Sequence, residues 1–314
     1  MSRFSYDVML PGSLLMRIDV PQPVFDDATA RLLAQAYLPS AQFVKTIIAL
    51  GKKPDLIVRF EESENCSLFV RGGLHRLRGK WQGEASLMDL LFLSYGAARL
   101  AWLKRGLYPV HAAALDLGDG GLTLLVGHSG SGKTAVTLSA VSRGHKVFSG
   151  NKTLVRIEGD RLVAVCGTRP MTTKAEDVER HLSTDAVKSG YQGRSAFLLK
   201  DEHYAATSPT AVHSILLPRL NDGVEKARRL GSLAALHRLY PYFLDTVNAD
   251  IVLAGGKAVL SGNPDKGVRE KLTAGLGVAL ATDDLFGGVK ATVKVMELEG
   301  SMAFINHTLD GERA

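Results

Sequence analysis

The stretch GHSGSGKT, residues 127–134, decides the fold of this 314-residue chain. It matches the pattern G-x-x-x-x-G-K-[ST] at every fixed position, between a strand-like run (122–126) and a helix-like run (134–143). Glycines allow backbone conformations in which successive N–H groups point at one anion, and a helix N-terminus adds partial positive charge. The stretch therefore predicts a nucleotide-phosphate loop made of Gly127, His128, Ser129, Gly130, Ser131, Gly132, Lys133 and Thr134.

The last two residues of the loop have distinct expected roles. The Lys133 ammonium would reach the β- and γ-phosphates of a nucleoside triphosphate, and the Thr134 hydroxyl would be a ligand of Mg²⁺. We therefore expect ATP and Mg²⁺ as cofactors. A glycine-rich turn that binds nothing is the alternative, and the full match between a strand and a helix disfavours it.

Composition is that of an ordinary globular protein. Lys and Arg (38) exceed Asp and Glu (32), which gives a net charge of +6 that suits anionic ligands without implying nucleic acid. The two cysteines, Cys66 and Cys166, have neither metal nor redox spacing. The N-terminus lacks the pattern of a secretory signal, and no apolar run reaches the ~18 residues of a membrane helix. These features predict a cytoplasmic protein that does not bind membranes.

The pattern of strands and helices predicts an α/β fold with a mixed sheet, because strands outnumber helices and tight turns join several of them. We place a boundary near residue 106. Residues 1–106 would form an α+β domain with a hairpin over 65–83 and a helix over 86–106. Residues 107–314 would form the nucleotide-binding domain. Its expected helices lie at 174–183, 231–240 and 266–280. Its expected strands include 146–149, 153–157, 162–166, 196–200, 214–218, 250–254 and 257–261, with a final hairpin of 289–299 and 302–306.

Residues 110–157 resemble the catalytic domain of the bacterial HPr kinase/phosphorylase family, which shares its core with phosphoenolpyruvate carboxykinases. The resemblance combines Val110-His111-Ala112 at the start of a strand, the glycine loop, and a helix that ends in Arg143-Gly144-His145. It implies a P-loop mixed-sheet core of that type and an ATP-dependent phosphotransferase. It also implies that His111 lies near the transferred phosphate, as a base or a phosphate contact, and that the chain forms a homo-oligomer.

The chain departs from this family at its catalytic acids. The family has two adjacent aspartates that hold magnesium and supply the general base, and Gly150 and Asn151 occupy those positions here. Asn151 could offer an oxygen to Mg²⁺ but cannot accept a proton, whereas Lys152 could contact a phosphate. His128 stands where the family often has an acid, and the segment that serves HPr binding is absent. The chain is therefore more similar to the divergent HPr-kinase-related proteins, and its catalytic base is unassigned.

Further charged residues give weaker signals. Arg169 could clamp a phosphate, and a replacement acid could come from a strand end or a turn, although solvated turns explain these acids as well. The acids are Asp160, Asp201, Glu202 and Asp250, with His203 beside two of them. A basic cluster could bind an acidic partner or single-stranded nucleic acid, but a solvated sheet face is the favoured interpretation. The cluster comprises Arg71, His75, Arg76, Arg78, Lys80 and Trp81.

Two functions from different classes follow. The favoured one is a kinase that transfers the γ-phosphoryl group of ATP to a hydroxyl of a small molecule, peptide or small protein, with residues 1–106 for acceptor recognition or assembly. Its expected catalytic residues are Lys133, His111 and Asn151, and its expected metal ligands are Thr134 and Asn151. The alternative is a nucleotide-binding regulatory protein with little or no chemistry. A phosphatase or a pyrophosphate-using activity is a third option.

Overall fold

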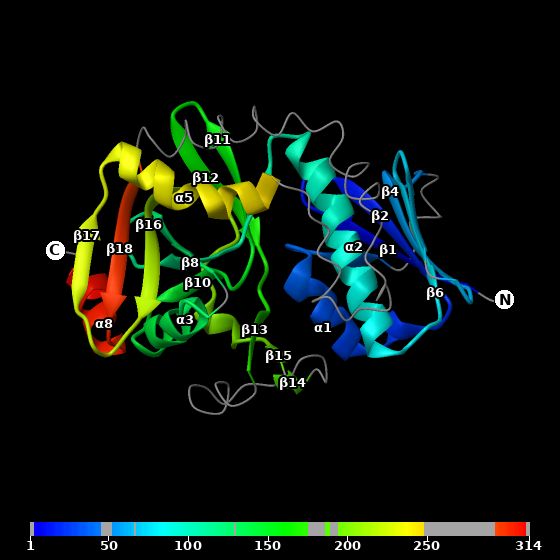
Figure 1. Ribbon diagram of the computed structural model, residues 1–314, viewed down its shortest axis with the longest axis horizontal. Helices are drawn as coiled ribbons and strands as arrows, with labels where there is room; N and C mark the ends of the chain where they lie inside the picture. Colours follow the sequence, from blue (N-terminus) through cyan, green and yellow to red (C-terminus); the bar gives the residue numbers. More distant parts are fainter. Residues whose placement is uncertain are drawn as a thin grey trace.

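The computed structural model describes residues 3–44, 52–65, 67–128, 130–174, 186–188, 194–247 and 293–311. Two large β-sheets, each with its own helices, lie beside one another (Figure 1). We call residues 3–103 the N-terminal unit and the part from residue 108 onward the second unit. The predicted mixed α/β character is confirmed. Within the ranges given above, no helix combines the length and the apolar character that crossing a membrane requires.

The N-terminal unit is a six-stranded sheet with helices on one face. Its strand order is β3-β1-β2-β4-β6-β5. The helices are α1 (Ala28–Tyr37) and α2 (Glu84–Leu103), and the strands are β1 (Phe4–Leu10), β2 (Leu14–Val20), β3 (Gln42–Val44), β4 (Leu56–Glu62), β5 (Ser67–Arg71) and β6 (Leu74–Gly79). The predicted hairpin over 65–83 is confirmed, since β5 and β6 pair in antiparallel register. Helix α1 ends two residues before Pro39, as expected because proline cannot continue a helix.

Helix α2 lies between the two sheets (Figure 1). Most of its residues are buried, and the buried positions are spread around the helix axis. A helix that packs against the protein on one side needs only an apolar stripe. A helix with buried residues all around its axis lies inside a core. Leu154 and Cys166 of the second unit pack into the same apolar cluster as α2. The two units therefore share part of their core.

The second unit is built on a mixed nine-stranded sheet. Its main path is β10-β8-β9-β16-β12-β11-β7, with β18 beside β16 and β17 beside β18. Strand β16 is parallel to both β9 and β18, and the other pairs are antiparallel. The strands are β7 (Tyr108–Val110), β8 (Ala112–Asp116), β9 (Leu122–Val126), β10 (Lys146–Ser149), β11 (Thr153–Glu158), β12 (Arg161–Gly167), β16 (Thr210–Leu220), β17 (Lys226–Arg229) and β18 (Lys294–Gly300).

Helices cover both faces of this sheet. One apolar cluster joins the sheet to α3 (Lys133–Ser142) and α8 (Met302–Gly311), and another joins it to α5 (Ser232–Val247). A small sheet of β13 (Met171–Lys174), β14 (Ala186–Lys188) and β15 (Arg194–Phe197) extends from the lower edge in Figure 1. The loop between β9 and α3 thus sits at the end of a central, fully buried strand.

The predicted hairpin at the C-terminal end is wrong. Residues 302–306 begin α8, and β18 pairs with β16 and β17 instead. The Ser301 hydroxyl accepts a hydrogen bond from the Phe304 amide (3.2 Å), which is the contact of a helix N-cap. Ile305 and Leu309 are the buried residues of α8, and their spacing of four is helical.

Several other predicted elements differ in extent. Helix α5 begins where the helix over 231–240 was expected but runs on through Pro241, and β15 ends at Phe197, earlier than the strand expected over 196–200. The expected helix over 174–183 starts in β13, and the rest of it lies outside the described residues. The expected elements at 250–254, 257–261 and 266–280 also lie outside them.

Candidate functional site

The glycine loop connects β9 to α3 as its pattern predicts. Gly130 (φ +87°) and Gly132 (φ +94°) take left-handed backbone conformations that residues with a Cβ rarely adopt. Gly132 is also the N-cap residue of α3, and a Cβ there would lie 2.6 Å from the Leu220 side chain. A hydrogen bond from the Ser131 amide to the His128 carbonyl (3.2 Å) closes the turn in this loop. Ser129 lies outside the described residues.

Lys133 folds back over this loop. Its ammonium donates hydrogen bonds to the carbonyl oxygens of Gly127 and His128, the latter at 3.0 Å. Burial, and then repulsion from the Lys152 charge, lower the pKa of Lys133 to about 8. A lysine with a lowered pKa lacks compensating negative charge, so an anion placed beside it would be bound with a favourable electrostatic energy.

Strand pairing brings three segments to the same end of the sheet. Ala112 of β8 pairs with Val126 of β9 in antiparallel register. The next pair of positions at this end of the two strands is His111 and Gly127, so these two residues lie opposite one another. Thr153 pairs with Val110 and donates its hydroxyl proton to the Ala112 carbonyl (2.9 Å). The turn 150–152, the start of the glycine loop and His111 are therefore neighbours.

His111 and Asn151 form a polar pair in this corner. His111 Nε2 lies 3.2 Å from Asn151 Oδ1, and Asn151 Nδ2 donates to the Ala36 carbonyl at 3.3 Å. Because only the Nδ2 group can donate to a carbonyl, the Asn151 oxygen faces the imidazole and His111 must carry its proton on Nε2. His111 is exposed, so a bound molecule could reach it.

Thr168 holds the turn that contains Asn151. Its hydroxyl accepts hydrogen bonds from the amides of Asn151 (3.1 Å) and Lys152 (3.0 Å), and its carbonyl accepts one from Gly150 (2.7 Å). A Cβ at Gly150 would lie 2.3 Å from Met171 Cγ. An aspartate cannot occupy this position without displacing Met171, so the turn disfavours the first acid of the resembling family.

The N-terminal unit contacts this turn from two helices. The Ala36 carbonyl of α1 accepts a hydrogen bond from the side-chain amide of Asn151. The Tyr95 ring of α2 lies under the Lys152 ammonium, with 4.0 Å between the ring centroid and Nζ. Ser40, just after α1, donates to the Gly167 carbonyl at 3.2 Å through both its amide and its hydroxyl. The cation–π contact fixes Lys152 beside the loop without neutralising its charge.

Oxygen ligands for a metal are few in this corner. Among the described ranges, no group of three or more His, Cys, Asp or Glu residues could hold a metal ion. Thr134 and Asn151 supply neutral oxygens only, and Asn151 Oδ1 is turned toward His111. These donors fit a magnesium ion that arrives on nucleotide phosphates and keeps its waters, but not one bound by protein carboxylates alone.

The other charged residues that were singled out from the sequence lie apart from this corner or are engaged elsewhere. Arg169 pairs with Asp201 (2.6 Å) and lies over the Tyr204 ring, 4.1 Å from its centroid. Glu202 lies 3.7 Å from His203. Asp160 is in the turn between β11 and β12. Asp250 lies outside the described residues.

An aromatic pair borders the loop and could not be found from the sequence. The rings of His128 and Tyr242 lie 4.6 Å apart between centroids, tilted by 48°. Tyr242 comes from α5, and burial raises the pKa of its phenol. The pair places a flat, partly apolar surface beside the glycine loop, where the resembling family often has an acid.

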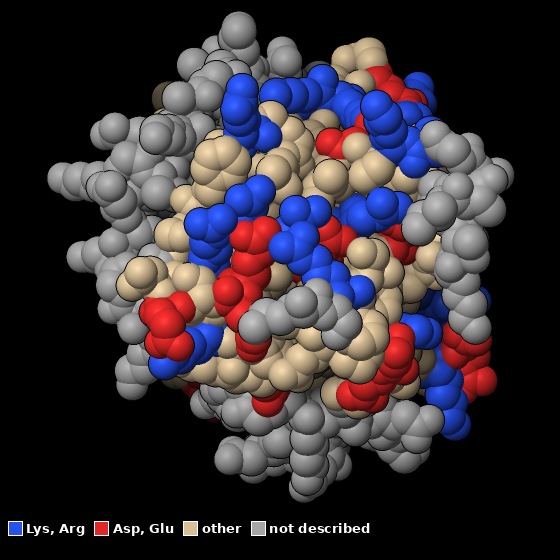
Figure 2. Space-filling view, turned by 90° about the vertical axis from the view of Figure 1, so that its right-hand side faces the viewer, with Lys and Arg blue, Asp and Glu red and all other residues tan. Residues whose placement is uncertain are grey.

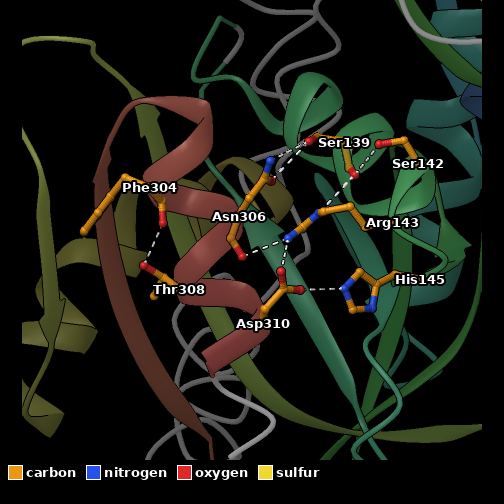
Figure 3. Close-up of polar contacts among 8 residues, drawn as sticks. All are labelled: Ser139, Ser142, Arg143, His145, Phe304, Asn306, Thr308 and Asp310. Atoms are coloured by element: carbon orange, nitrogen blue, oxygen red, sulfur yellow. Dashed lines mark hydrogen bonds and ion pairs between the residues drawn. The ribbon is translucent and has the colours of Figure 1, made fainter.

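Arg143 and His145 stabilise the fold next to the site. Arg143 donates to Asp310 (2.7 Å) and to the Asn306 carbonyl (2.8 Å), and His145 Nε2 lies 3.3 Å from the other Asp310 oxygen (Figure 3). Burial alone would raise the pKa of Asp310, but the contacts with His145 and Arg143 outweigh it and leave the pKa below its usual value. These contacts join the C-terminal ends of α3 and α8, so this motif positions the loop helix and lies outside the site.

Comparison with known proteins adds little to this geometry. No family model matches the chain, and no curated protein matches it. One solved structure that resembles it is the Hpr(Ser) kinase/phosphatase from Coxiella burnetii, with 15% sequence identity and a TM-score of 0.24 over 39% of this chain and 76% of that chain. A TM-score this low establishes no common fold, so the likeness to that family is carried by residues 110–157 of this chain.

Proposed function

We propose that the chain is an ATP- and Mg²⁺-dependent phosphotransferase that moves the γ-phosphoryl group to a hydroxyl of a small molecule, peptide or small protein. One observation carries the proposal. The Lys133 ammonium lies over the glycine loop at the N-terminus of α3, with a lowered pKa and a second cation, Lys152, nearby. Such a cluster of positive charge suits a triphosphate.

In this proposal the loop amides and Lys133 bind the β- and γ-phosphates. Lys152, held on the Tyr95 ring, is placed to contact the transferred group. The Thr134 hydroxyl would hold Mg²⁺, which when bound would neutralise part of the phosphate charge. Phosphoryl transfer depends mainly on positioning and charge stabilisation, so two lysines offset part of what the missing carboxylates would supply.

The proton of the acceptor hydroxyl goes to His111 in this proposal. Asn151 Oδ1 lies 3.2 Å from Nε2 of the ring and orients it. A base oriented by a second residue is a recurring catalytic arrangement. Asn151 is then a positioning residue, and the role of the family aspartate passes to the imidazole.

The test is nucleotide binding followed by phosphoryl transfer. Calorimetry should detect ATP binding to the full chain, Lys133→Ala should weaken it by about a hundredfold or more, and radiolabelled ATP with a cell extract should label an acceptor only with Mg²⁺ present. Absence of binding to ATP, ADP, GTP and pyrophosphate on folded protein would refute the proposal.

A nucleotide-binding regulator is the second candidate. It is favoured by the turn at 150–152, where the Met171 side chain fills the space that a first aspartate would need. Tight ATP binding with no labelled acceptor, no hydrolysis and no magnesium dependence would identify this function in place of the kinase.

A further inference from the structure

The outer face of the N-terminal sheet is lined with arginines. Helices α1 and α2 cover the other face, and no described element covers this one (Figures 1 and 2). Residues that pair across strands point to the same side of a sheet. The pairs Asp19↔Arg59, Arg59↔Arg76 and Arg76↔Phe69 thus form one row across four strands. The arginines of this face, which we call the arginine face, are Arg3, Arg17, Arg59, Arg71, Arg76 and Arg78.

Among the residues that the structure describes, the arginine face has twice as many guanidinium groups as carboxylates. Three acids belong to it, Asp7, Asp19 and Glu61. Arg17 binds both oxygens of Asp7 (2.8 and 2.9 Å), and Arg59 binds Asp19 (2.8 Å). The face as a whole therefore keeps a surplus of positive charge. Figure 2 shows blue side chains interleaved with the red carboxylates across it.

Glu61 lies at the centre of the arginine face, among four of its arginines. It lies 3.1 Å from Arg78 Nε, 3.3 Å from Arg3, 3.4 Å from Arg76 and 3.8 Å from Arg59. One carboxylate thus holds four guanidinium groups together. Like charges directly opposite one another, as in Arg59↔Arg76, destabilise a sheet unless a counterion lies between them.

The acids lie deeper than the arginines. The Glu61 side chain is 16% exposed, whereas Arg78 is 47% and Arg3 is 51% exposed. The carboxylates therefore lie closer to the sheet, and the guanidinium groups form the outer layer of the arginine face. Guanidinium N–H groups that point outward match carboxylates in bidentate geometry, which a lysine cannot do.

The same face also carries an exposed aromatic ring. Phe69 is 46% exposed and lies under the Arg76 guanidinium, 5.6 Å from the ring centroid. A single aromatic is too few for the series of stacked bases that single-stranded nucleic acid needs. A segment of protein with spaced carboxylates fits better.

Two members of the basic cluster in the sequence do not belong to this face. His75 is buried on the core side, and the Trp81 ring packs edge-on against Phe60 with centroids 4.9 Å apart. Lys80 pairs with Glu64 at 2.7 Å. Three members of the sequence cluster, Arg71, Arg76 and Arg78, therefore lie on the arginine face.

We infer that the arginine face is a docking surface for an acidic segment of a partner protein. This inference does not rest on the proposed function, because the face lies on the side of the sheet away from the helices that contact the site. Opposite charges steer such a partner and fix its orientation, and salt weakens the contact.

The test uses a fluorescent oligo-glutamate peptide and the full-length chain. We expect binding at low ionic strength, and we expect Arg71→Glu/Arg78→Glu to weaken it by roughly tenfold or more. Both residues are exposed, so the variant should fold, and circular dichroism checks this. Lys146→Glu/Arg161→Glu is the matched control. Both of these residues are exposed, the change in charge is equal, and both lie in the second unit, away from the arginine face. It should change affinity less than about twofold.

Three results would overturn the inference. They are no peptide binding at low salt, equal losses in the two double variants, and tighter binding of an oligothymidylate of equal charge, which would assign the face to nucleic acid. If Arg71→Glu/Arg78→Glu fails to fold, Arg71→Gln/Arg78→Gln is used, and it should still weaken binding several-fold.

Discussion

His111 and Asn151 are forty positions apart in the chain, and their side chains meet at 3.2 Å because β7 and β11 are paired. Asn151 also receives its third partner, the Ala36 carbonyl, from a helix of the N-terminal unit. The amide therefore links the imidazole to that unit. An asparagine satisfies both contacts because it has an oxygen and an NH₂ group, whereas an aspartate has only oxygens.

Restoring the family acid with Asn151→Asp should destabilise the chain by about 1–3 kcal/mol at pH 8, because a carboxylate would face the Ala36 carbonyl with no donor between them. The carboxylate would also raise the pKa of His111 in the folded state. The stability gained from that pair is present at low pH and lost as pH rises through the raised pKa. The loss measured by urea unfolding should thus be larger at pH 8 than at pH 6.

Asn151→Ala is the control for this change. It removes the hydrogen bond to the Ala36 carbonyl, as Asn151→Asp does, and also the contact with His111, but it adds no charge, so its destabilisation should not vary between pH 6 and pH 8. A loss for Asn151→Asp that is the same at both pH values would contradict the placement of His111 beside residue 151.

Binding of ATP should take up a proton at about pH 8.5. The pKa of Lys133 is lowered to about 8, so the amine is mostly neutral at this pH, and a polyanion beside it would raise the pKa again. Calorimetry in two buffers with different ionisation enthalpies measures the uptake. Lys133→Arg keeps the charge but does not titrate, so it should bind ATP without proton uptake.

The same lysine sets a pH trend in the absence of nucleotide. Between about pH 8 and the unfolded value of 10.5, Lys133 is more protonated in the unfolded chain than in the folded one, so its own contribution to the free energy of unfolding should rise with pH, although the buried Cys166 thiol, with a pKa raised to about 11, contributes in the opposite direction. This rise should be absent in Lys133→Met. An equal rise in that variant would assign the trend to other groups.

Gly150→Ala should destabilise the chain by about 1–3 kcal/mol, because the new methyl group would meet Met171 at 2.3 Å in a well-packed core. Shortening Met171 should relieve the clash. The double variant Gly150→Ala/Met171→Ala is therefore expected to be more stable than the sum of the two single losses predicts. Additive losses in chemical unfolding would show that the two side chains do not compete for space.

The glycine loop, its strand and its helix were predictable because their signal is local. Gly130, Gly132 and Lys133 lie within one short pattern, and each has a backbone or charge requirement of its own. The mixed sheet was predictable for the same reason, since strand-like runs alternate with turns. The C-terminal hairpin failed because MAFIN is rich in residues that also favour strands, although Ser301 offered a helix-capping signal.

The contacts that define the site's corner could not be predicted. Asn151 meets an atom of residue 36, and Lys152 meets the ring of residue 95. Such contacts depend on how the N-terminal unit packs on the second unit, which no local pattern encodes. The lack of room for an acid at position 150 likewise depends on Met171, which comes from another strand.

The pairing of Asp310 with Arg143 and His145 gives the last prediction. Asp310→Asn should lower the melting temperature at pH 7, because it removes the negative charge that both partners contact. The pKa of Asp310 is lowered in the folded state, so its contribution is present at neutral pH and is lost as pH falls below the unfolded value of 3.8. The wild-type chain and Asp310→Asn should therefore converge in stability in acid. Asp222→Asn, at an exposed turn residue, is the matched control and should leave the melting temperature unchanged. A difference between wild type and Asp310→Asn that persists undiminished in acid would mean that the charge of Asp310 does not stabilise the contact between α3 and α8.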